Sequence, residues 1–360
     1  MLTCLAIASL ALAPGSQTRE PARADSAAGV DVRVDSAHHE VVVTVRRIHI
    51  PEGTYYGHQH AEAYLQFLWP VRGWARGYRV DVLDSVGRAL PREVLHHAGI
   101  ADLDRRQLPY PMPLRLFAAG RETPALMLPA SMGVPMTPDE HLVLYYMLVN
   151  PAAAAIDGAT LRISIAWTPD RAKGPRNVFP LSLDANPAVG GARSFDLPPG
   201  VSITSAEFTI PAGGYLRAVG GHVHDYAVEL RLEDAATNKV LARITAQRDS
   251  TGRITGVSSD RFLFKWRGLH LAANQRYRVV SVYDNPTCTT IPSGAMAFMV
   301  GPFIPDDVRR WPAVDPANPL FLEDYAELVS SAGDAGHPHD MAEMKGMADI
   351  ADKTPACRRS

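Results

Sequence analysis

Two histidines separated by one residue, His222 and His224, are the side chains of this sequence best placed to do chemistry. They follow Gly220 and Gly221 and lead into residues 227–232, where apolar and polar side chains alternate as in a half-buried strand. Side chains on a strand repeat every second residue, so both imidazoles project from one face, with their Cβ atoms roughly 7 Å apart. That spacing lets both rings reach one metal ion. A surface pair beside a glycine turn is the alternative interpretation.

His96 and His97 form a second candidate pair, within the short apolar segment 94–100. Adjacent residues of an ideal strand face opposite sides, so both rings reach one ion only if the strand bends or bulges. Met296 lies in a later apolar run. A methionine there ordinarily fills a core, but its thioether is also a soft ligand that selects copper(I).

The C-terminal tail is enriched in the same ligand types, a mixture that prefers copper. These tail residues are His337, His339, Met341, Met344 and Met347. A copper role there would be accessory, and a polar tail with chance enrichment is the alternative. His58 and His60 repeat the His-x-His spacing, but next to Gly57 in a segment that reads as a loop.

The composition and net charge of the chain indicate which kinds of binding partner to expect. The 360-residue chain is 46% hydrophobic and 21% charged, with a net charge of -2, which gives no reason to expect nucleic acid or an anionic membrane as partner. No segment approaches the ~20 apolar residues of a membrane-spanning helix, so we expect no membrane span in the mature chain.

The N-terminus predicts an exported protein, periplasmic or extracellular. Residues 1–13 form an apolar run that ends in Ala-x-Ala, which is typical of a secretory signal peptide. Removal of this segment would take Cys4 with it and leave Cys288 and Cys357. These two could form one disulfide in an oxidising compartment, a pairing that spacing alone does not establish.

Short strand-like segments between turns dominate the chain, which contains 29 Pro and 27 Gly. This pattern predicts an all-β fold of two consecutive jelly-roll-like antiparallel β-sandwich domains. The predicted parts are a signal peptide over 1–13, a disordered lead over 14–29, an N-terminal sandwich over 30–170, a C-terminal sandwich over 171–305, and a C-terminal extension over 306–360 with a short helix near 320–329.

The order of these motifs resembles that of the copper type II, ascorbate-dependent monooxygenases, the group of peptidylglycine α-hydroxylating monooxygenase and dopamine β-monooxygenase. The segment around His222 looks most similar to their relatives in the stress-up-regulated nodulin family. The resemblance implies two jelly-roll domains that each hold one copper, with a solvent-filled cleft between them. It matches His222, His224 and Met296 to the oxygen-binding copper site, and His96 and His97 to two ligands of the electron-transfer site.

Met147 departs from the family's pattern, because it stands where the third histidine of the electron-transfer site is expected. A thioether at this position would favour copper(I) and raise the reduction potential of the site. Alternatively, Met147 packs in a core where a metal site has been lost.

Three hypotheses follow from the resemblance. In the first, one or two copper ions and a reductant such as ascorbate support hydroxylation of a C–H bond by O2, in a small-molecule or peptide substrate. In the second, the protein sequesters or delivers copper without catalysis. In the third, it is a structural β-sandwich with vestigial metal sites. Whether the chain is an enzyme stays open at this level.

Overall fold

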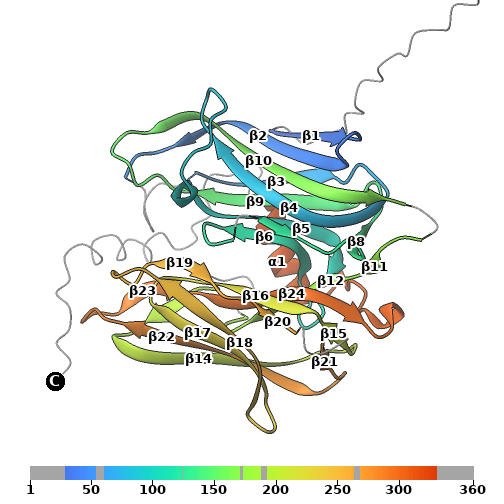
Figure 1. Cartoon of the computed structure of the whole chain (residues 1–360), viewed down its shortest axis with the longest axis vertical. Helices are drawn as coiled ribbons and strands as arrows, with labels where there is room; N and C mark the ends of the chain where they lie inside the picture. The colour runs from blue at the N-terminus through green and yellow to red at the C-terminus, as the bar shows by residue number, and fades with distance from the viewer. Residues whose placement is uncertain are drawn as a thin grey trace, which may run out of the picture.

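The computed structural model describes residues 29–53, 61–123, 125–170, 173–187, 193–262 and 268–330 (Figure 1). These residues form two jelly-roll-like β-sandwiches, which confirms the predicted all-β class. The predicted signal peptide, the His/Met-rich tail, and His58 and His60 lie outside the described residues. No helix among the described residues is long and apolar enough to cross a membrane.

The first sandwich contains the strands from Val30 to Asn177. Their bounds are β1 Val30–Asp35, β2 Glu40–Ile50, β3 Ala61–Leu68, β4 Gly73–Leu83, β5 Leu95–Arg106, β6 Pro113–Gly120, β7 Ala125–Met127, β8 Met132–Met136, β9 His141–Leu148, β10 Ile156–Pro169 and β11 Arg176–Asn177. One sheet has the order β1-β2-β10-β4-β8-β11, with β7 paired to β4, and the facing sheet has the order β3-β9-β5-β6. A 3-10 helix, Arg92–Val94, leads into β5.

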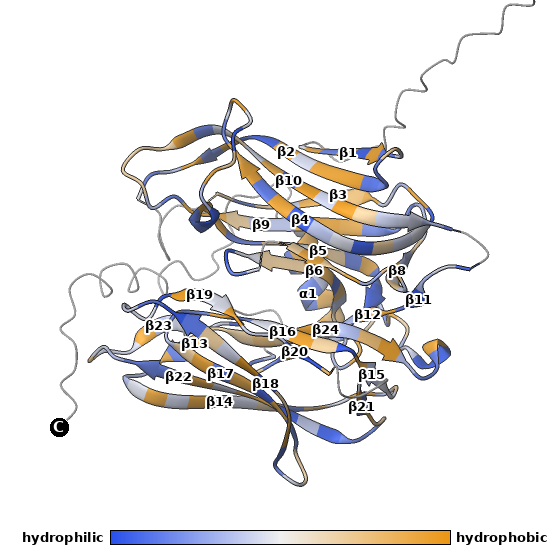
Figure 2. Ribbon diagram, in the orientation of Figure 1, coloured by the Kyte–Doolittle hydropathy of each residue, from blue (hydrophilic) through white to orange (hydrophobic). Residues whose placement is uncertain are grey.

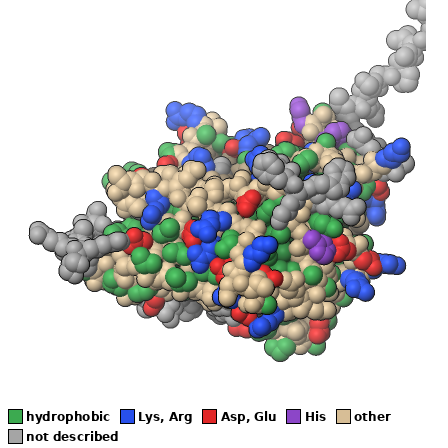
Figure 3. Space-filling model, turned by 60° about the horizontal axis from the view of Figure 1, so that its bottom comes forward, with side chains coloured by type: hydrophobic (Ala, Val, Ile, Leu, Met, Phe, Trp, Pro, Cys, Tyr) green, Lys and Arg blue, Asp and Glu red, His purple; other side chains and the backbone are tan. Residues whose placement is uncertain are grey.

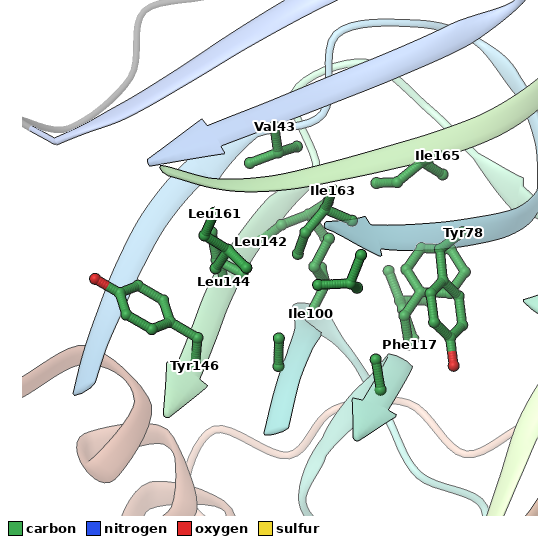
Figure 4. Close-up of a cluster of buried hydrophobic side chains, with 14 of the residues drawn as sticks. Val43, Tyr78, Ile100, Phe117, Leu142, Leu144, Tyr146, Leu161, Ile163 and Ile165 are labelled. Atoms are coloured by element: carbon green, nitrogen blue, oxygen red, sulfur yellow. The ribbon is translucent and has the colours of Figure 1, made fainter. Parts of the chain in front are cut away.

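Side chains from both sheets fill the core of this sandwich (Figure 4). Val43 and Ile163 come from one sheet, and Ile100, Leu142 and Leu144 come from the other; none is more than 2% exposed. Branched side chains suit this position because they pack well against neighbours on a pleated surface. The ribbon in Figure 2 accordingly changes between hydrophobic and hydrophilic along individual strands.

The second sandwich begins where strand pairing changes partners, between Asn177 and Phe179. Its strands are β12 Phe179–Asp184, β13 Phe195–Leu197, β14 Gly200–Thr209, β15 Gly214–Leu216, β16 Ala218–Val223, β17 Ala227–Asp234, β18 Lys239–Arg248, β19 Ile254–Val257, β20 Asp260–Arg261, β21 Leu269–Leu271, β22 Arg276–Asn285, β23 Ile291–Ala295 and β24 Ala297–Pro305. One sheet has the order β20-β16-β24-β15-β21, with β12 paired to β24. The other has the order β14-β22-β17-β18-β19, and β13 pairs with β23.

An apolar join connects the two sandwiches. The segment between β5 and β6 places Leu108, Tyr110 and Met112 in the core of the second sandwich. Trp311, which follows the 3-10 helix Val308–Arg310, packs against both cores, with its ring centroid 4.6 Å from that of Phe179. The term apolar join is used below for Leu108, Tyr110, Met112 and Trp311.

The helix α1, Pro319–Ser330, returns to the first sandwich and contacts β3, β6 and β9. Its start has a physical cause, because the Asn318 side chain accepts hydrogen bonds from the amides of Leu320 and Phe321, and Pro319 suits the first helical turn. The nearly buried Asp324 then accepts a hydrogen bond from Arg115 at 2.8 Å and lies 3.5 Å from Arg193.

The surface carries no dominant charge on the face shown in Figure 3, where basic and acidic side chains are interspersed. This agrees with the small net charge of the chain. Cys288 is disulfide-bonded, and its partner lies outside the described residues.

Candidate functional site

The two predicted histidine pairs meet at one place, between the sandwiches. The ring centroids of His96, from the first sandwich, and His224, from the second, are 6.1 Å apart. The rings of His222 and His224 are 5.4 Å apart, and those of His96 and His97 are 5.0 Å apart. Three charged residues join this group. We call the set the histidine junction, and its members are His96, His97, His222, His224, Arg121, Glu122 and Asp225.

A β-bulge explains why His96 and His97 lie on the same side. The pairing of β5 with β9 shifts register between Leu95 and His97, so the alternation of side chains is interrupted at the start of β5. The two Nδ1 atoms are 3.0 Å apart and the ring planes make an angle of 76°. The sequence argument required a bend or bulge for both rings to lie on one side of the strand, and the structure contains that bulge.

His222 and His224 are presented by the end of β16. Gly221 allows this strand to approach β24 closely, because a Cβ at Gly221 would lie 2.7 Å from the carbonyl oxygen of Phe298. Just beyond the strand, the amide of His224 donates to the carbonyl of Met296 at 3.3 Å. The expectation that both rings share one side is correct, since both line the same pocket.

The turn after β6 supplies the charged partners. Glu122 Oε1 lies 2.7 Å from His222 Nδ1, and Arg121 Nη2 lies 2.6 Å from Asp225 Oδ1. Both contacts cross from the first sandwich to the second. Gly120 leaves the space that the Glu122 side chain needs, because a Cβ there would lie 2.5 Å from Glu122 Oε2. The geometry thus couples the two sandwiches through two directional polar contacts.

Burial shapes the protonation of the junction. Desolvation by itself would raise the pKa of Glu122, but the charge and hydrogen bond of His222, together with Arg121, outweigh it and leave this pKa below its ordinary value. Glu122 is therefore a carboxylate. Desolvation also holds the pKa values of His96 and His224 well below the ordinary value, helped by the neighbouring histidines and Arg121. These two imidazoles are therefore neutral at physiological pH.

A small pocket lies within the junction, lined by residues that include Glu93, His96, Glu122, His222 and His224. Its volume is about 20 Å³, which is enough for about one water molecule and too small for an organic substrate. The carboxylate of Glu122 accepts a hydrogen bond from the Nδ1–H of His222 and so orients this ring toward the pocket wall. Chemically, the site can hold a water molecule that hydrogen-bonds to these polar side chains.

The two methionines assigned to copper lie beside the junction. The carbonyl of Met296 accepts hydrogen bonds from the Tyr283 hydroxyl and from the His224 amide, but Met296 does not line the pocket. Met147 sits opposite His97 in the pairing of β9 with β5. The tail histidines and methionines, residues 337–347, lie outside the described residues.

The arrangement of the two histidine pairs differs from the two separate copper sites that the sequence suggested, while the individual ligand assignments stay predictions. Two ring nitrogens 3.0 Å apart, as in His96 and His97, could serve one ion. However, among the described residues no three His, Cys, Asp or Glu side chains are placed to hold a metal ion. The prediction of two separate sites across a solvent-filled cleft also differs from the structure, since the two pairs form one cluster around a pocket of about 20 Å³.

Sequence reasoning missed Arg121, Glu122 and Asp225. No strand was predicted over residues 113–120, so the turn that carries Arg121 and Glu122 had no assigned place. The charged pair directly after the small residues 118–120 was the available signal. Asp225 stood beside His224 in the sequence, but its contact depends on how the sandwiches pack.

Comparison with known proteins gives no family. No family model matches the chain, and no curated protein matches it. Similar solved structures include the STIV MCP, with a TM-score of 0.37 and 11% identity over 77% of this chain and 99% of that chain. They also include the major capsid protein P2 from bacteriophage PM2, with a TM-score of 0.34 and 8% identity over 74% and 98% of the respective chains. PNGF-II has a TM-score of 0.32 and 7% identity over 72% and 65% of the respective chains.

These similarities are too weak to carry an argument about function. No family model and no curated protein connects the chain with the copper monooxygenases, so the predicted resemblance is wrong. The functional hypothesis of a copper monooxygenase or copper-binding protein is wrong with it, since no finding supports it and no group of three His, Cys, Asp or Glu side chains among the described residues is placed to hold a metal ion.

Proposed function

We propose that this chain is a structural protein, a rigid block in which two β-sandwiches are fixed to each other. The observation that carries the proposal is that the junction side chains are engaged across the boundary, with Glu122 on His222 and Arg121 on Asp225. Charge-assisted hydrogen bonds depend on geometry, so contacts of this kind across an interface hold its two sides in one relative orientation. A pocket of about 20 Å³ leaves no room between them for an organic substrate.

Other contacts support the same proposal. Domains of one chain are expected to move relative to each other unless their interface is large and hydrophobic. Here Leu108 and Met112 are 0% and 2% exposed and belong to the core of the opposite sandwich. Asp324, on the C-terminal helix, contacts Arg115 of the first sandwich and Arg193 near the start of the second. The interface is thus held by apolar, polar and helical contacts together.

Export from the cell is a further part of the proposal. The signal-like residues 1–13 predict it, and a disulfide at Cys288 suits an oxidising compartment.

Differential scanning calorimetry of the full chain tests the proposal. A rigid block should unfold in one cooperative transition, with equal calorimetric and van't Hoff enthalpies. His222→Ala should lower the Tm by roughly 2–4 °C per kcal/mol lost, without splitting the transition. Glu207→Ala, at an exposed pair with Arg276, is the matched control and should leave the Tm almost unchanged.

Two results would contradict the proposal. One is a pair of separate transitions in the wild-type chain. The other is a large rise in Tm when zinc or copper ions are added to the chelator-treated variant His337→Ala/His339→Ala, in which the tail histidines are removed and all cysteines are kept. Such a rise would show that the histidine junction binds a metal ion.

A further inference from the structure

A second pocket lies on the outer face of the first sandwich, away from the histidine junction. Its volume is about 300 Å³, at the lower end of the usual range for small-molecule sites. The residues that line it come from the β1–β2 turn, β4, β7 and β10, whose arrangement can be followed in Figure 1. These lining residues are His38, His39, Arg76, Met127, Ala166, Trp167, Thr168 and Pro169.

Arg76 gives the pocket a positive charge. One guanidinium nitrogen donates to the carbonyl of Leu128 at 3.0 Å. Among the residues that the structure describes, no carboxylate pairs with Arg76, and its buried Nε–H has no hydrogen-bond partner. Because no described carboxylate neutralises this guanidinium at the pocket wall, an anion that entered the pocket would meet an uncompensated positive charge.

Trp167 gives the pocket an aromatic wall. The indole ring is held at an edge-to-face angle of 84° by His39, with ring centroids 5.7 Å apart. The amide of Trp167 donates to the carbonyl of His39 at 2.9 Å, which fixes the hairpin turn against β10. Its indole N–H is also buried and without a partner among the described residues. Met127 lies at the rim and is 62% exposed, so it can adapt to an apolar ligand.

Local backbone geometry places these two side chains together. The pairing of β10 with β4 shifts register between Ala166 and Trp167, and this bulge lies opposite Arg76. Bulges re-aim side chains at sites of this kind. Asp35 does not line the pocket, and its carboxylate lies 2.7 Å from Nδ1 of His38.

We propose that this outer pocket binds a small aromatic carboxylate, with the carboxylate on Arg76 and the ring against Trp167. A guanidinium recognises a carboxylate through paired N–H donors, and aromatic rings gain energy from offset or edge-to-face contact. The proposal is independent of the structural role of the histidine junction, because no residue is shared between the two sites.

Titration calorimetry with phenylacetate as the probe tests it. The wild-type chain should bind phenylacetate saturably, and Arg76→Gln should weaken binding roughly tenfold or more, the loss expected for a charge-assisted hydrogen bond. Trp167→Leu should weaken binding several-fold, and 2-phenylethylamine, with the same ring and the opposite charge, should not bind. Arg79→Gln, three residues along the same strand and paired with Asp81, is the matched control and should change the affinity less than about twofold.

Circular dichroism and thermal unfolding confirm that each variant is folded. If Arg76→Gln does not fold, Arg76→Lys keeps the charge but loses the paired donors, and it should still weaken binding. Absence of saturable phenylacetate binding, equal binding in the Arg76 variant, or equal affinity for acetate and phenylacetate would each overturn the proposal.

Discussion

The two sandwiches are connected by two regions of opposite chemistry. In the apolar join, Leu108, Tyr110 and Met112 of the β5–β6 segment are buried in the core of the second sandwich. The hydrophobic effect that stabilises this contact does not depend on direction. The histidine junction connects the same bodies through charged contacts such as Glu122 to His222, whose strength depends on geometry. We therefore expect the apolar join to supply most of the stability of the interface, and the directional contacts of the histidine junction to set the relative orientation of the sandwiches.

Leu108→Ala should have the largest effect, because it opens a cavity in the apolar join. Leu108 is 0% exposed, and such a truncation lowers the free energy of unfolding by about 2–5 kcal/mol. Urea denaturation followed by circular dichroism measures it. Leu320→Ala, at a leucine that is 42% exposed, is the control and should cost far less. Equal effects at the two sites would mean that the apolar join is not a packed core.

Asp184→Asn should stabilise the apolar join at neutral pH. The amide of Asp184 donates to the Tyr110 hydroxyl at 3.1 Å, and burial raises the pKa of the carboxyl to about 6 from 3.8. A carboxyl whose pKa is raised by folding favours the folded state when protonated, so stability is lost as pH rises through the window from about 4 to 6. Removing the charge should recover up to about 3 kcal/mol at pH 7.5.

Measuring the free energy of unfolding at two pH values isolates the contribution of the Asp184 charge. The stability difference between Asp184→Asn and wild type should shrink toward zero near pH 4, where both side chains are neutral. Asp170→Asn, at an exposed position, should show little difference at either pH. A gain that is the same at pH 4 and pH 7.5 would mean that the charge of Asp184 is not its source.

Glu122→Gln should have a smaller effect, because the amide keeps an acceptor for His222 but loses the charge. The expected loss is about 1–2 kcal/mol, the difference between a charge-assisted and a neutral hydrogen bond. Chemical denaturation at pH 7.5 measures it. Glu207→Gln should stay within about 0.5 kcal/mol of wild type, since that carboxylate is 44% exposed. If the Glu122 variant is as stable as the Glu207 variant, the Glu122–His222 contact does not stabilise the interface.

Local features of the fold followed from the sequence. Residues 320–329 were predicted as a helix, and α1 spans Pro319–Ser330 with Asn318 as its cap. The two-residue repeat placed His222 and His224 on one side, as found. Such features depend on neighbours along the chain, whose preferences a sequence displays directly.

The histidine junction as a whole could not be predicted in this way. His96 meets His224 only because the start of β5 lies against the end of β16 at the boundary between the sandwiches, and no local preference encodes that contact. The family resemblance was misleading because short His motifs on strands can arise in unrelated sandwiches, and function depends on the site rather than the fold. Glu122 lay in a region without a predicted strand, so its role became visible only in three dimensions.

The central claim, that the two sandwiches form one rigid block, is tested most directly by residual dipolar couplings of backbone amides in weakly aligned, deuterated protein. A rigid block predicts a single alignment tensor, with the same magnitude and orientation for amides of residues 30–177 and residues 179–305. Tensors of different magnitude for the two sandwiches would show independent motion and would contradict the account.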